Sequence, residues 1–307
     1  MKRLSIVLAS LAFGLTISSC GPSAAQKAIL EMPSVNEVKG GLNNKLYWLE
    51  NNAQSGGNYV LEVGAPQPRT QKDNPFFTIW DLSYKGKSNI TITIKGVGEN
   101  WVVSRGEFGT IFNVGSGVTL VLENITLQGI KGVNAIDRLK TGPLIDVSSG
   151  GTLVMNEGSA IIGNQNNSKD GGGVYVSGGG TFLMKGGTIS GNECFPVTDV
   201  AAASASGGKY NAIREQKFYG GGVYVAGEVT LFGKTIPAGN FTKTGGTITG
   251  YSGQKDANAN VVSEFNAQSV SQNKGHAVYA GNKHRETTAG PDVNLSFSNG
   301  EFSGDWE

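Results

Sequence analysis

The hexapeptide GGGVYV occupies residues 171–176 and recurs unchanged at residues 220–225, and a related copy, GHAVYA, occupies residues 275–280. Each copy places an apolar–polar–apolar triplet after a small residue, which is the alternation expected of a short β-strand. Three earlier segments show the same alternation: TIWDLS (78–83), TIFNVG (110–115) and PLIDVS (143–148). Repetition of one strand along a chain is typical of repeat architectures, in which equivalent segments stack on one another.

Two further strand types repeat between these segments. The second type comprises TITIK (91–95), TLVLE (119–123), TLVMN (152–156), TFLMK (181–185) and NLSFS (294–298), with one copy open between VTLF (229–232) and a segment that starts at Phe241. The third type comprises VSRG (103–106), TLQG (126–129), AIIG (160–163), TISG (188–191), TITG (247–250) and EFSG (301–304). Three strand types in a fixed order, repeated about six times, predict an all-β fold: a right-handed parallel β-helix.

Stacked turns bury columns of like side chains. The expected columns are Leu120, Leu153 and Phe182; then Leu122, Met155, Met184 and Phe297; and then Leu127, Ile161, Ile189, Ile248 and Phe302. A glycine closes every third-type strand, which predicts a recurring corner with positive φ. A polar column of Asn164, Asn192 and Asp305 is expected to follow that corner.

The open ends of such a stack need covers, because a bare terminal strand invites aggregation. Residues 42–53, LNNKLYWLENNA, place Leu42, Leu46 and Leu49 at helical spacing. We interpret residues 42–63 as an N-terminal cap made of this helix and the strand NYVLEV (58–63), followed by the β-helix over residues 64–307. At the other end, Trp306 is expected to lie over the last turn.

The first residues have the features of an export signal. A basic start is followed by the apolar run LSIVLASLAFGLTI and then by ISSC, which ends at Cys20. This pattern predicts a signal peptide over residues 1–19, lipidation of Cys20 and a linker over residues 20–41. The alternative is a plain secretory signal with a coincidental cysteine. Lipidation would tether the chain to the bacterial outer membrane or cell surface and leave Cys194 unpaired, without a disulfide framework.

Composition limits the classes of partner. The chain of 307 residues carries 16% charged residues and a net charge of +1, so no nucleic-acid partner is expected. Extra length collects in four connections that precede first-type strands, at 130–142, 164–171, 192–219 and 251–275, with further interruptions at 233–240 and 282–292. Such loops stack on one side of a solenoid, where they form a binding face or are tolerated insertions.

Strand alternation also predicts an outward column on the first strand type. It comprises Asp81, Asn113, Asp146, Tyr175, Tyr224 and Tyr279. Tyrosines in successive strands stabilise a sheet by stacking, without any ligand. The alternative hypothesis is an aromatic platform, built from Tyr175, Tyr224 and Tyr279, for sugar rings or for side chains of a partner.

A polysaccharide-cleaving enzyme would need clustered acids. Asp81 and Asp146 are the plausible acids, but they lie two turns apart, about 10 Å by the strand spacing. The spacings of the two histidines, His276 and His284, predict no metal site, and no phosphate-binding loop or nucleophile motif occurs. We therefore expect no cofactor.

Several segments in combination resemble the β-helix lipoproteins of spirochaetes, particularly treponemes. These include ITITIKGVGE, GTIFNVGSGVTLVLENITLQG, GGTLVMNEGSAIIGN and the GGGVYV copies, and the resemblance spans about residues 27–307. A looser similarity links GGGVYV and TISGN to chlamydial polymorphic outer-membrane proteins. The resemblance implies a pectate-lyase-like solenoid displayed at the cell surface, and it brings no established catalytic residues.

These features together predict a non-enzymatic surface lipoprotein whose scaffold recognises glycans or host proteins. One alternative is a lyase or glycoside hydrolase of the pectate-lyase-like fold that uses Asp81 and Asp146. A further alternative is a structural envelope protein.

Overall fold

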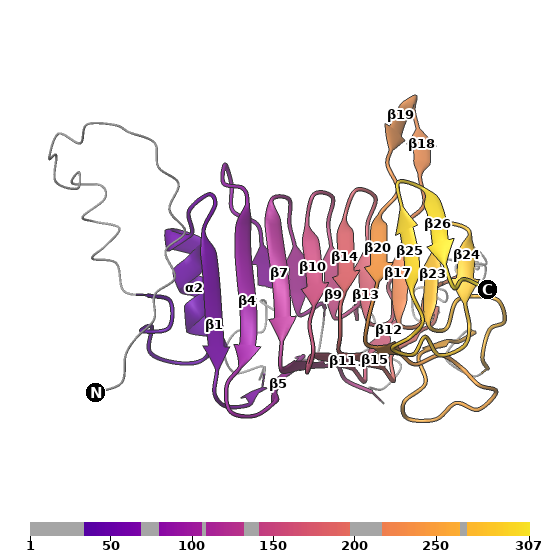
Figure 1. Cartoon of the computed structure of the whole chain (residues 1–307), viewed down its shortest axis with the longest axis horizontal. Coiled ribbons are helices and arrows are strands. Elements are labelled where there is room, and N and C mark those ends of the chain that lie inside the picture. The colour runs from indigo at the N-terminus through magenta and orange to yellow at the C-terminus, as the bar shows by residue number, and fades with distance from the viewer. Residues whose placement is uncertain (1–33, 69–79, 106–108, 132–140, 197–216, 265–268) are drawn as a thin grey trace, which may run out of the picture.

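The structure is a computed structural model, and it describes residues 34–68, 80–105, 109–131, 141–196, 217–264 and 269–307 (Figure 1). The predicted signal peptide, Cys20 and most of the linker lie outside the described residues, as does the middle of the connection 192–219. The described part is mainly β-strand, as the sequence predicts, and most of its strands pair in parallel.

Three large sheets carry most of the strands. The first, eight-stranded sheet contains β1 (Asn58–Val63), β4 (Ile90–Gly96), β7 (Val118–Glu123), β10 (Thr152–Met155), β14 (Thr181–Met184), β20 (Asn240–Lys243), β25 (Leu295–Ser298) and β26 (Glu301–Gly304). The second, six-stranded sheet contains β2 (Gln67–Pro68), β5 (Trp101–Ser104), β8 (Ile125–Gln128), β11 (Ala160–Ile162), β15 (Thr188–Ser190) and β21 (Thr247–Ile248). The third, seven-stranded sheet contains β3 (Trp80–Leu82), β6 (Phe112–Val114), β9 (Ile145–Val147), β13 (Val174–Val176), β17 (Val223–Val225), β23 (Val278–Ala280) and β24 (Lys283–Arg285).

The chain visits the three sheets in the same order again and again. The successive visits are β1–β2–β3, β4–β5–β6, β7–β8–β9, β10–β11–β13, β14–β15–β17 and β20–β21–β23. Within each sheet the new strand pairs in parallel with the strand from the preceding visit. Each visit therefore adds one strand to each of the three sheets, which gives the row of strands in Figure 1.

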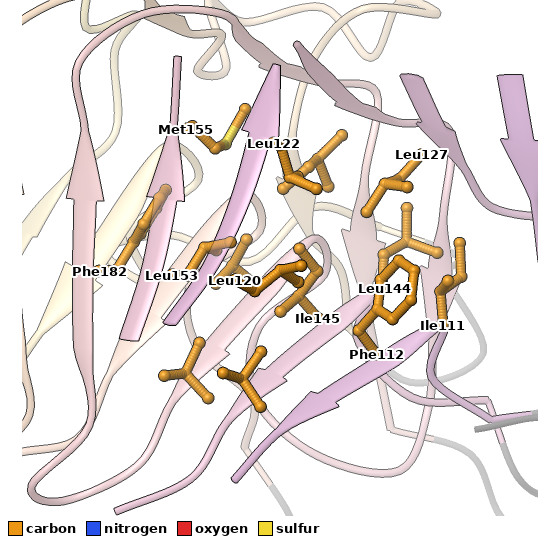
Figure 2. Packing of buried hydrophobic residues seen from close by; sticks show 14 of the residues in the cluster. Ile111, Phe112, Leu120, Leu122, Leu127, Leu144, Ile145, Leu153, Met155 and Phe182 are labelled. Atoms are coloured by element: carbon orange, nitrogen blue, oxygen red, sulfur yellow. The ribbon is translucent and has the colours of Figure 1, made fainter. Parts of the chain in front are cut away.

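Most of the predicted core columns are confirmed. Leu120, Leu153 and Phe182 are register partners on adjacent strands of the first sheet, as Figure 2 shows, and Phe241 continues their column. In the second sheet, Leu127, Ile161, Ile189 and Ile248 form the predicted column, and all four are 0% exposed. Alternation places these side chains inside, where burial of each stabilises the fold by about 1.5–3 kcal/mol.

The C-terminal members of those columns were predicted wrongly. Phe297 pairs with Phe241, not with Met184, and Phe302 pairs with Phe297, both in antiparallel register. The chain reverses after β23, because β24 runs antiparallel to it, and β25 then runs antiparallel to β20. An antiparallel hairpin, β25–β26, therefore closes this end of the stack, and the indole of Trp306 meets the Phe302 ring edge-on at 5.2 Å.

The sequence left two candidates for one second-type strand, VTLF (229–232) and a segment that starts at Phe241. In the structure that strand of the first sheet is β20 (Asn240–Lys243). The other candidate segment forms β18 (Val229–Leu231), which pairs antiparallel with β19 (Lys234–Ile236). This hairpin projects from the body of the molecule (Figure 1). Lys243 occupies the column position expected for an apolar residue, and its ammonium donates to the carbonyls of Gly290 (2.6 Å) and Val293 (2.7 Å).

The N-terminal helix is confirmed as α2 (Leu42–Asn52), at the end of the row of strands (Figure 1). It buries Leu42, Leu46 and Leu49 and lies against β1. The strand that the sequence assigned to the cap is β1, which pairs in parallel with β4 over its full length. This strand is thus the first strand of the stack, and α2 covers its open end.

The predicted polar column exists with a different third member. The third member is Asn260 in place of Asp305: the Asn164 N–H donates to Asn192 Oδ1 (3.1 Å), and the Asn192 N–H donates to Asn260 Oδ1 (3.0 Å). Asn260 lies in the connection 251–275, where spacing gave no register. Asp305 follows the antiparallel hairpin and accepts from the Asn294 N–H.

The glycines that close the third-type strands differ among themselves. Gly163, Gly191 and Gly304 have the predicted positive φ, whereas Gly129 and Gly250 do not. A Cβ on Gly129 would lie 2.5 Å from Asn164 Cα, and a Cβ on Gly250 would lie 2.2 Å from the Glu286 carbonyl oxygen. Close approach of backbone, and not φ, explains glycine at these two corners.

Gly220, the first residue of the second GGGVYV copy, allows the cost of backbone strain to be separated from the cost of a steric contact. Gly220 has φ +69°, and a Cβ there would lie 2.3 Å from the Val223 carbonyl oxygen. Gly220→Ala is therefore expected to cost about 2–3 kcal/mol of unfolding free energy, measured by urea denaturation. Gly233→Ala is the matched control, because Gly233 has φ +75° with nothing within 4 Å. It should lose only about 1 kcal/mol. Equal losses would show that the close contact at Gly220 is absent.

Candidate functional site

The third sheet carries the predicted outward column. Its register partners are Asp81, Asn113, Asp146, Tyr175, Tyr224 and Tyr279, in that order, across β3, β6, β9, β13, β17 and β23. The residues on either side of each member point inward and are buried. The placement of all six predicted residues in one column is therefore confirmed.

The three tyrosine rings stack on one another. The ring centroids of Tyr175 and Tyr224 are 5.2 Å apart with an interplanar angle of 14°, and those of Tyr224 and Tyr279 are 5.9 Å apart at 2°. The Lys169 ammonium lies 3.8 Å from the centroid of Tyr175. The faces of Tyr175 and Tyr224 are thus covered within the protein, so a ligand would meet ring edges and hydroxyl groups.

The tyrosine hydroxyls remain protonated at neutral pH. All three side chains are half-buried. Burial raises the pKa of Tyr175, Tyr224 and Tyr279, and nearby carboxylates or tyrosines act in the same direction. Each hydroxyl can therefore both donate and accept a hydrogen bond.

Asp146 and Lys169 form an ion pair at the polar end of the tyrosines. The same Lys169 ammonium lies over the Tyr175 ring. One cation therefore contacts two neighbouring members of the outward column, Asp146 and Tyr175. Cation–π contacts of this kind contribute about 0.5–1 kcal/mol at exposed sites. Sequence analysis missed Lys169 because it lies in the connection 164–171, where no strand period fixes its position.

A second column runs beside the tyrosines. Asp170, Tyr219 and Lys274 each directly precede a glycine with positive φ in the three copies of the repeated motif. The Tyr219 N–H donates to Asp170 Oδ1 (2.8 Å), and the Lys274 ammonium lies 4.5 Å from the centroid of the Tyr219 ring. The Tyr219 ring in turn lies 4.4 Å from that of Tyr279. Each of these residues immediately precedes a copy of the repeated motif. This constant position is a sequence signal from which the column could have been predicted.

Asp170 is the acid with the most perturbed pKa near the tyrosines. Burial raises the pKa of its carboxyl to about 6, while the Tyr219 amide and the charge of Lys169 act in the opposite direction. A half-buried carboxyl with a raised pKa beside a lysine and a tyrosine is a typical composition of a functional site.

The raised pKa predicts a pH dependence of stability. Because the folded state binds the Asp170 proton more tightly than the unfolded state, the contribution to stability is complete below about pH 4 and is lost as pH rises through about 6. Asp170→Asn mimics the neutral acid. The parent should therefore lose up to about 3 kcal/mol relative to this variant between pH 4 and pH 7, measured by urea denaturation. Asp81→Asn, which makes the same substitution on an exposed side chain, is the control. A constant difference for Asp170→Asn would contradict the prediction.

Asp81 and Asp146 are not brought together. Asp81 is exposed, and its Oδ1 accepts from Asn113 Nδ2 (3.3 Å). Asn113 Oδ1 accepts from Ser148 Oγ (2.9 Å), so β6 separates the two acids. Asp81 and Asp146 therefore contact different partners and do not form a shared acidic site.

The connections carry order that the sequence did not reveal. A three-stranded parallel sheet, made of β12 (Gln165–Asn166), β16 (Glu193–Cys194) and β22 (Val261–Val262), lies within the predicted connections. Beside it, buried His276 accepts from the Val262 N–H at Nδ1 (3.0 Å), and its Nε2 lies 3.0 Å from Glu286 Oε2. Burial lowers the pKa of His276, so it serves as a neutral link between β22 and β23.

Within the described ranges no cluster of three or more His, Cys, Asp or Glu side chains could hold a metal ion. The Cys194 thiol is buried, and burial raises its pKa well above the usual value. In this part of the chain no helix has the length and apolar character needed to cross a membrane.

Comparison with known proteins found no matching family model, no matching curated protein and no matching solved structure.

Proposed function

We propose that the chain is a right-handed parallel β-helix that acts as a non-enzymatic recognition scaffold for glycans or host proteins. The repeated order of visits to three mainly parallel sheets supports the helical winding. The right-handed sense rests on the general rule that about 98% of parallel crossover connections have this hand. Export and a lipid anchor on Cys20 belong to the same proposal and rest on the sequence of residues 1–20.

One observation carries the recognition proposal: the three stacked tyrosines in register on the outer face of the third sheet. Strand pairing fixes their backbones and stacking restricts their side chains, so little conformational entropy remains to be lost on binding. Lys169 and Lys274 add cationic groups beside the rings. A row of hydroxyls with flanking cations suits an extended ligand rich in hydroxyl or carboxylate groups.

The test separates the contribution of the tyrosine hydroxyls to glycan binding from the contribution of the tyrosine rings. The parent and a triple Tyr175→Phe, Tyr224→Phe, Tyr279→Phe variant are applied to a broad glycan array. The triple variant keeps the stacked rings but removes the hydroxyls, so we expect unchanged thermal stability and at least about ten-fold weaker binding, since each lost hydrogen bond is worth about 0.5–1.5 kcal/mol.

Tyr47→Phe is the matched control, because Tyr47 is exposed on α2 at the other end of the stack. It should bind as the parent does. Equal binding by parent and triple variant would reject the hydroxyl row as the recognition surface. An array without any binding would direct the search to host proteins, with the same variants as probes.

The enzyme alternative has one observation in its favour. Asp146, Lys169, Asp170 and Tyr175 surround one end of the tyrosine column, and burial raises the pKa of Asp170 to about 6, within the range of a general acid or base. Release of products from a polysaccharide by the parent, lost in Asp170→Asn and in Asp146→Ala but kept in Asp81→Asn, would establish this function in place of the scaffold.

A further inference from the structure

The hairpin formed by β18 and β19 concentrates exposed apolar side chains. Seven large apolar side chains are exposed in the described part of the chain, and four of them lie within residues 229–236: Val229, Leu231, Phe232 and Ile236. Phe232 lies at the tip and is 107% exposed, so its ring is wholly in solvent. Packing inside the protein therefore does not explain these side chains, because none of the four is buried.

The turn of this hairpin has a second unfavourable feature. Phe232 has φ +50° and Gly233 has φ +75°, both in the left-handed region. Such a turn favours Asn-Gly, because a bulky side chain is strained there. The chain itself uses that pair, Asn299 and Gly300, in the hairpin β25–β26, with φ +53° and +80°. Phe232 is thus both strained and fully exposed, and an outlier of this kind points to a function.

The dimensions and faces of the hairpin suit the surface of a bilayer. One face carries the register partners Val229, Ile236, Leu231 and Lys234. The opposite face carries Thr230 and Thr235, whose hydroxyl oxygens are 3.2 Å apart. Three residues of rise from Val229 to Phe232 give about 10 Å, which matches the about 5–10 Å that interfacial segments reach into a bilayer. The stem of Lys234 can lie along the apolar face while its ammonium reaches the phosphates.

The hairpin stands on one edge of the stack, which we call the hairpin edge. This edge consists of the corners that join the third sheet to the first, at 83–89, 115–117, 148–151, 177–180 and 226–239. The three middle corners contain only Gly and Ser. At the foot of the hairpin, the Gly179 N–H donates to the Ala238 carbonyl (3.1 Å). Figure 1 shows β18 and β19 above the other corners, so the tip can meet a flat surface first.

The charges of the hairpin edge favour an anionic surface. The edge carries three lysines and one acid: Lys85, Lys87, Lys234 and Glu228. The neighbouring edge, where the corners join the first sheet to the second, has the opposite balance of one lysine and two acids: Lys185, Glu99 and Glu157. Each lysine close to an anionic membrane strengthens binding. The apolar tip and the cations therefore lie on the same edge of the molecule.

We propose that the β18–β19 hairpin inserts its tip into the surface of an anionic phospholipid bilayer. Phe232 and Leu231 enter the acyl region, and Lys234 contacts the phosphates. The inference does not depend on the proposed function, because it uses neither the tyrosine column nor a lipid on Cys20. The triple Tyr→Phe variant should bind vesicles as the parent does, so failure of one proposal is distinguishable from failure of the other.

The first test locates the tip directly. The full chain with Phe232→Trp is mixed with vesicles of equal parts phosphatidylcholine and phosphatidylglycerol that carry brominated acyl chains, which quench an indole on contact. The fluorescence that the new indole adds to that of the four native tryptophans should be mostly lost. Val97→Trp is the matched control, because Val97 is 44% exposed but lies on the neighbouring edge. Its added fluorescence should remain.

The second test measures binding by co-sedimentation with the same vesicles, with Cys20→Ser in every chain so that no lipid anchor contributes. Phe232→Asn restores the favoured turn, so its melting temperature should equal or exceed that of the parent. We expect its binding to be at least about ten-fold weaker, because the buried ring is lost. Lys234→Gln should bind about five-fold more weakly on these vesicles and as the parent does on pure phosphatidylcholine.

Three results would overturn the proposal. The first is quenching at position 232 that does not exceed quenching at position 97. The second is binding of Phe232→Asn equal to that of the parent. The third is a parent dimer, seen by analytical ultracentrifugation without vesicles, that Phe232→Asn converts to a monomer, because the tip would then be a contact between two copies of the chain.

Discussion

Ile189→Asp is expected to lose more than about 4 kcal/mol of unfolding free energy at pH 7, because it places an unpaired charge inside the stack. Ile189 is 0% exposed, and its register partners are Ile161 on one side and Ile248 on the other. None of these neighbours offers a hydrogen-bonding side chain. The measurement is urea denaturation followed by circular dichroism, and a variant that is already unfolded without urea also meets the expectation.

Ser190→Asp is the matched control for this prediction. Ser190 is the next residue of β15, and its half-buried side chain lies on the opposite face of the strand. The same charge at this position should cost less than about 1 kcal/mol, because water reaches it. Similar losses in the two variants would mean that the inward and outward assignments of β15 are wrong.

Asn192→Ala is expected to lose about 3–5 kcal/mol, the second-largest effect, because one side chain serves several buried groups. Asn192 is 0% exposed. Its Oδ1 accepts from the Asn164 N–H (3.1 Å), and its Nδ2 donates to the Ile161 carbonyl (3.0 Å) and to Asn260 Oδ1 (3.0 Å). Removal of the amide leaves the Asn164 N–H without its acceptor and takes the amide donor away from the Ile161 carbonyl, at a corner that water does not reach.

Asn51→Ala provides the comparison on an exposed amide. Asn51 lies in the last turn of α2, and its Nδ2 donates to the Tyr47 carbonyl (3.2 Å). Solvent replaces that bond, so the change in unfolding free energy should stay within about 0.5 kcal/mol. If Asn192→Ala were equally mild, the asparagine column would not contribute to the stability of the corner.

The regular part of the fold could be predicted from sequence because strand alternation fixes it locally. Ile161 and Ile189 each occupy the same position in a short repeated strand, so their register follows once the strands are aligned. The outward position of Tyr175 and Tyr224 follows from the same alternation. A slip of one residue would turn every one of these side chains to the other face, which makes the register strongly specified.

The irregular part depends on contacts between segments that share no period. Asn260 joins the asparagine column from a connection with no strand pattern, and Phe297 pairs antiparallel because β24 reverses the chain. Reversal leaves the alternation of Leu295–Ser298 unchanged, so the sequence of that strand cannot distinguish the two directions.

The candidate site likewise has one part that the repeat predicts and another part that depends on contacts from the connections. The tyrosines belong to the repeat and were found, whereas Lys169 reaches Tyr175 and Asp146 from a connection. The pKa of Asp170 reflects burial by surrounding segments, a property of the folded chain that spacing does not contain.

The outward column exists only if adjacent turns are in register, and disulfide trapping tests that register most directly. Asn113 and Asp146 are register partners on β6 and β9. Adjacent strands lie about 4.8 Å apart, within the Cα range of about 4.4–6.8 Å that a disulfide spans. The double variant Asn113→Cys, Asp146→Cys should therefore form an intramolecular disulfide on mild oxidation. After oxidation the two introduced cysteines should no longer react with an alkylating reagent, so the variant should show no more alkylatable thiols than the parent. Asn113→Cys with Val147→Cys should not, because Val147 points inward. A disulfide in the second variant and none in the first would contradict the outward column and the proposed recognition surface that depends on it.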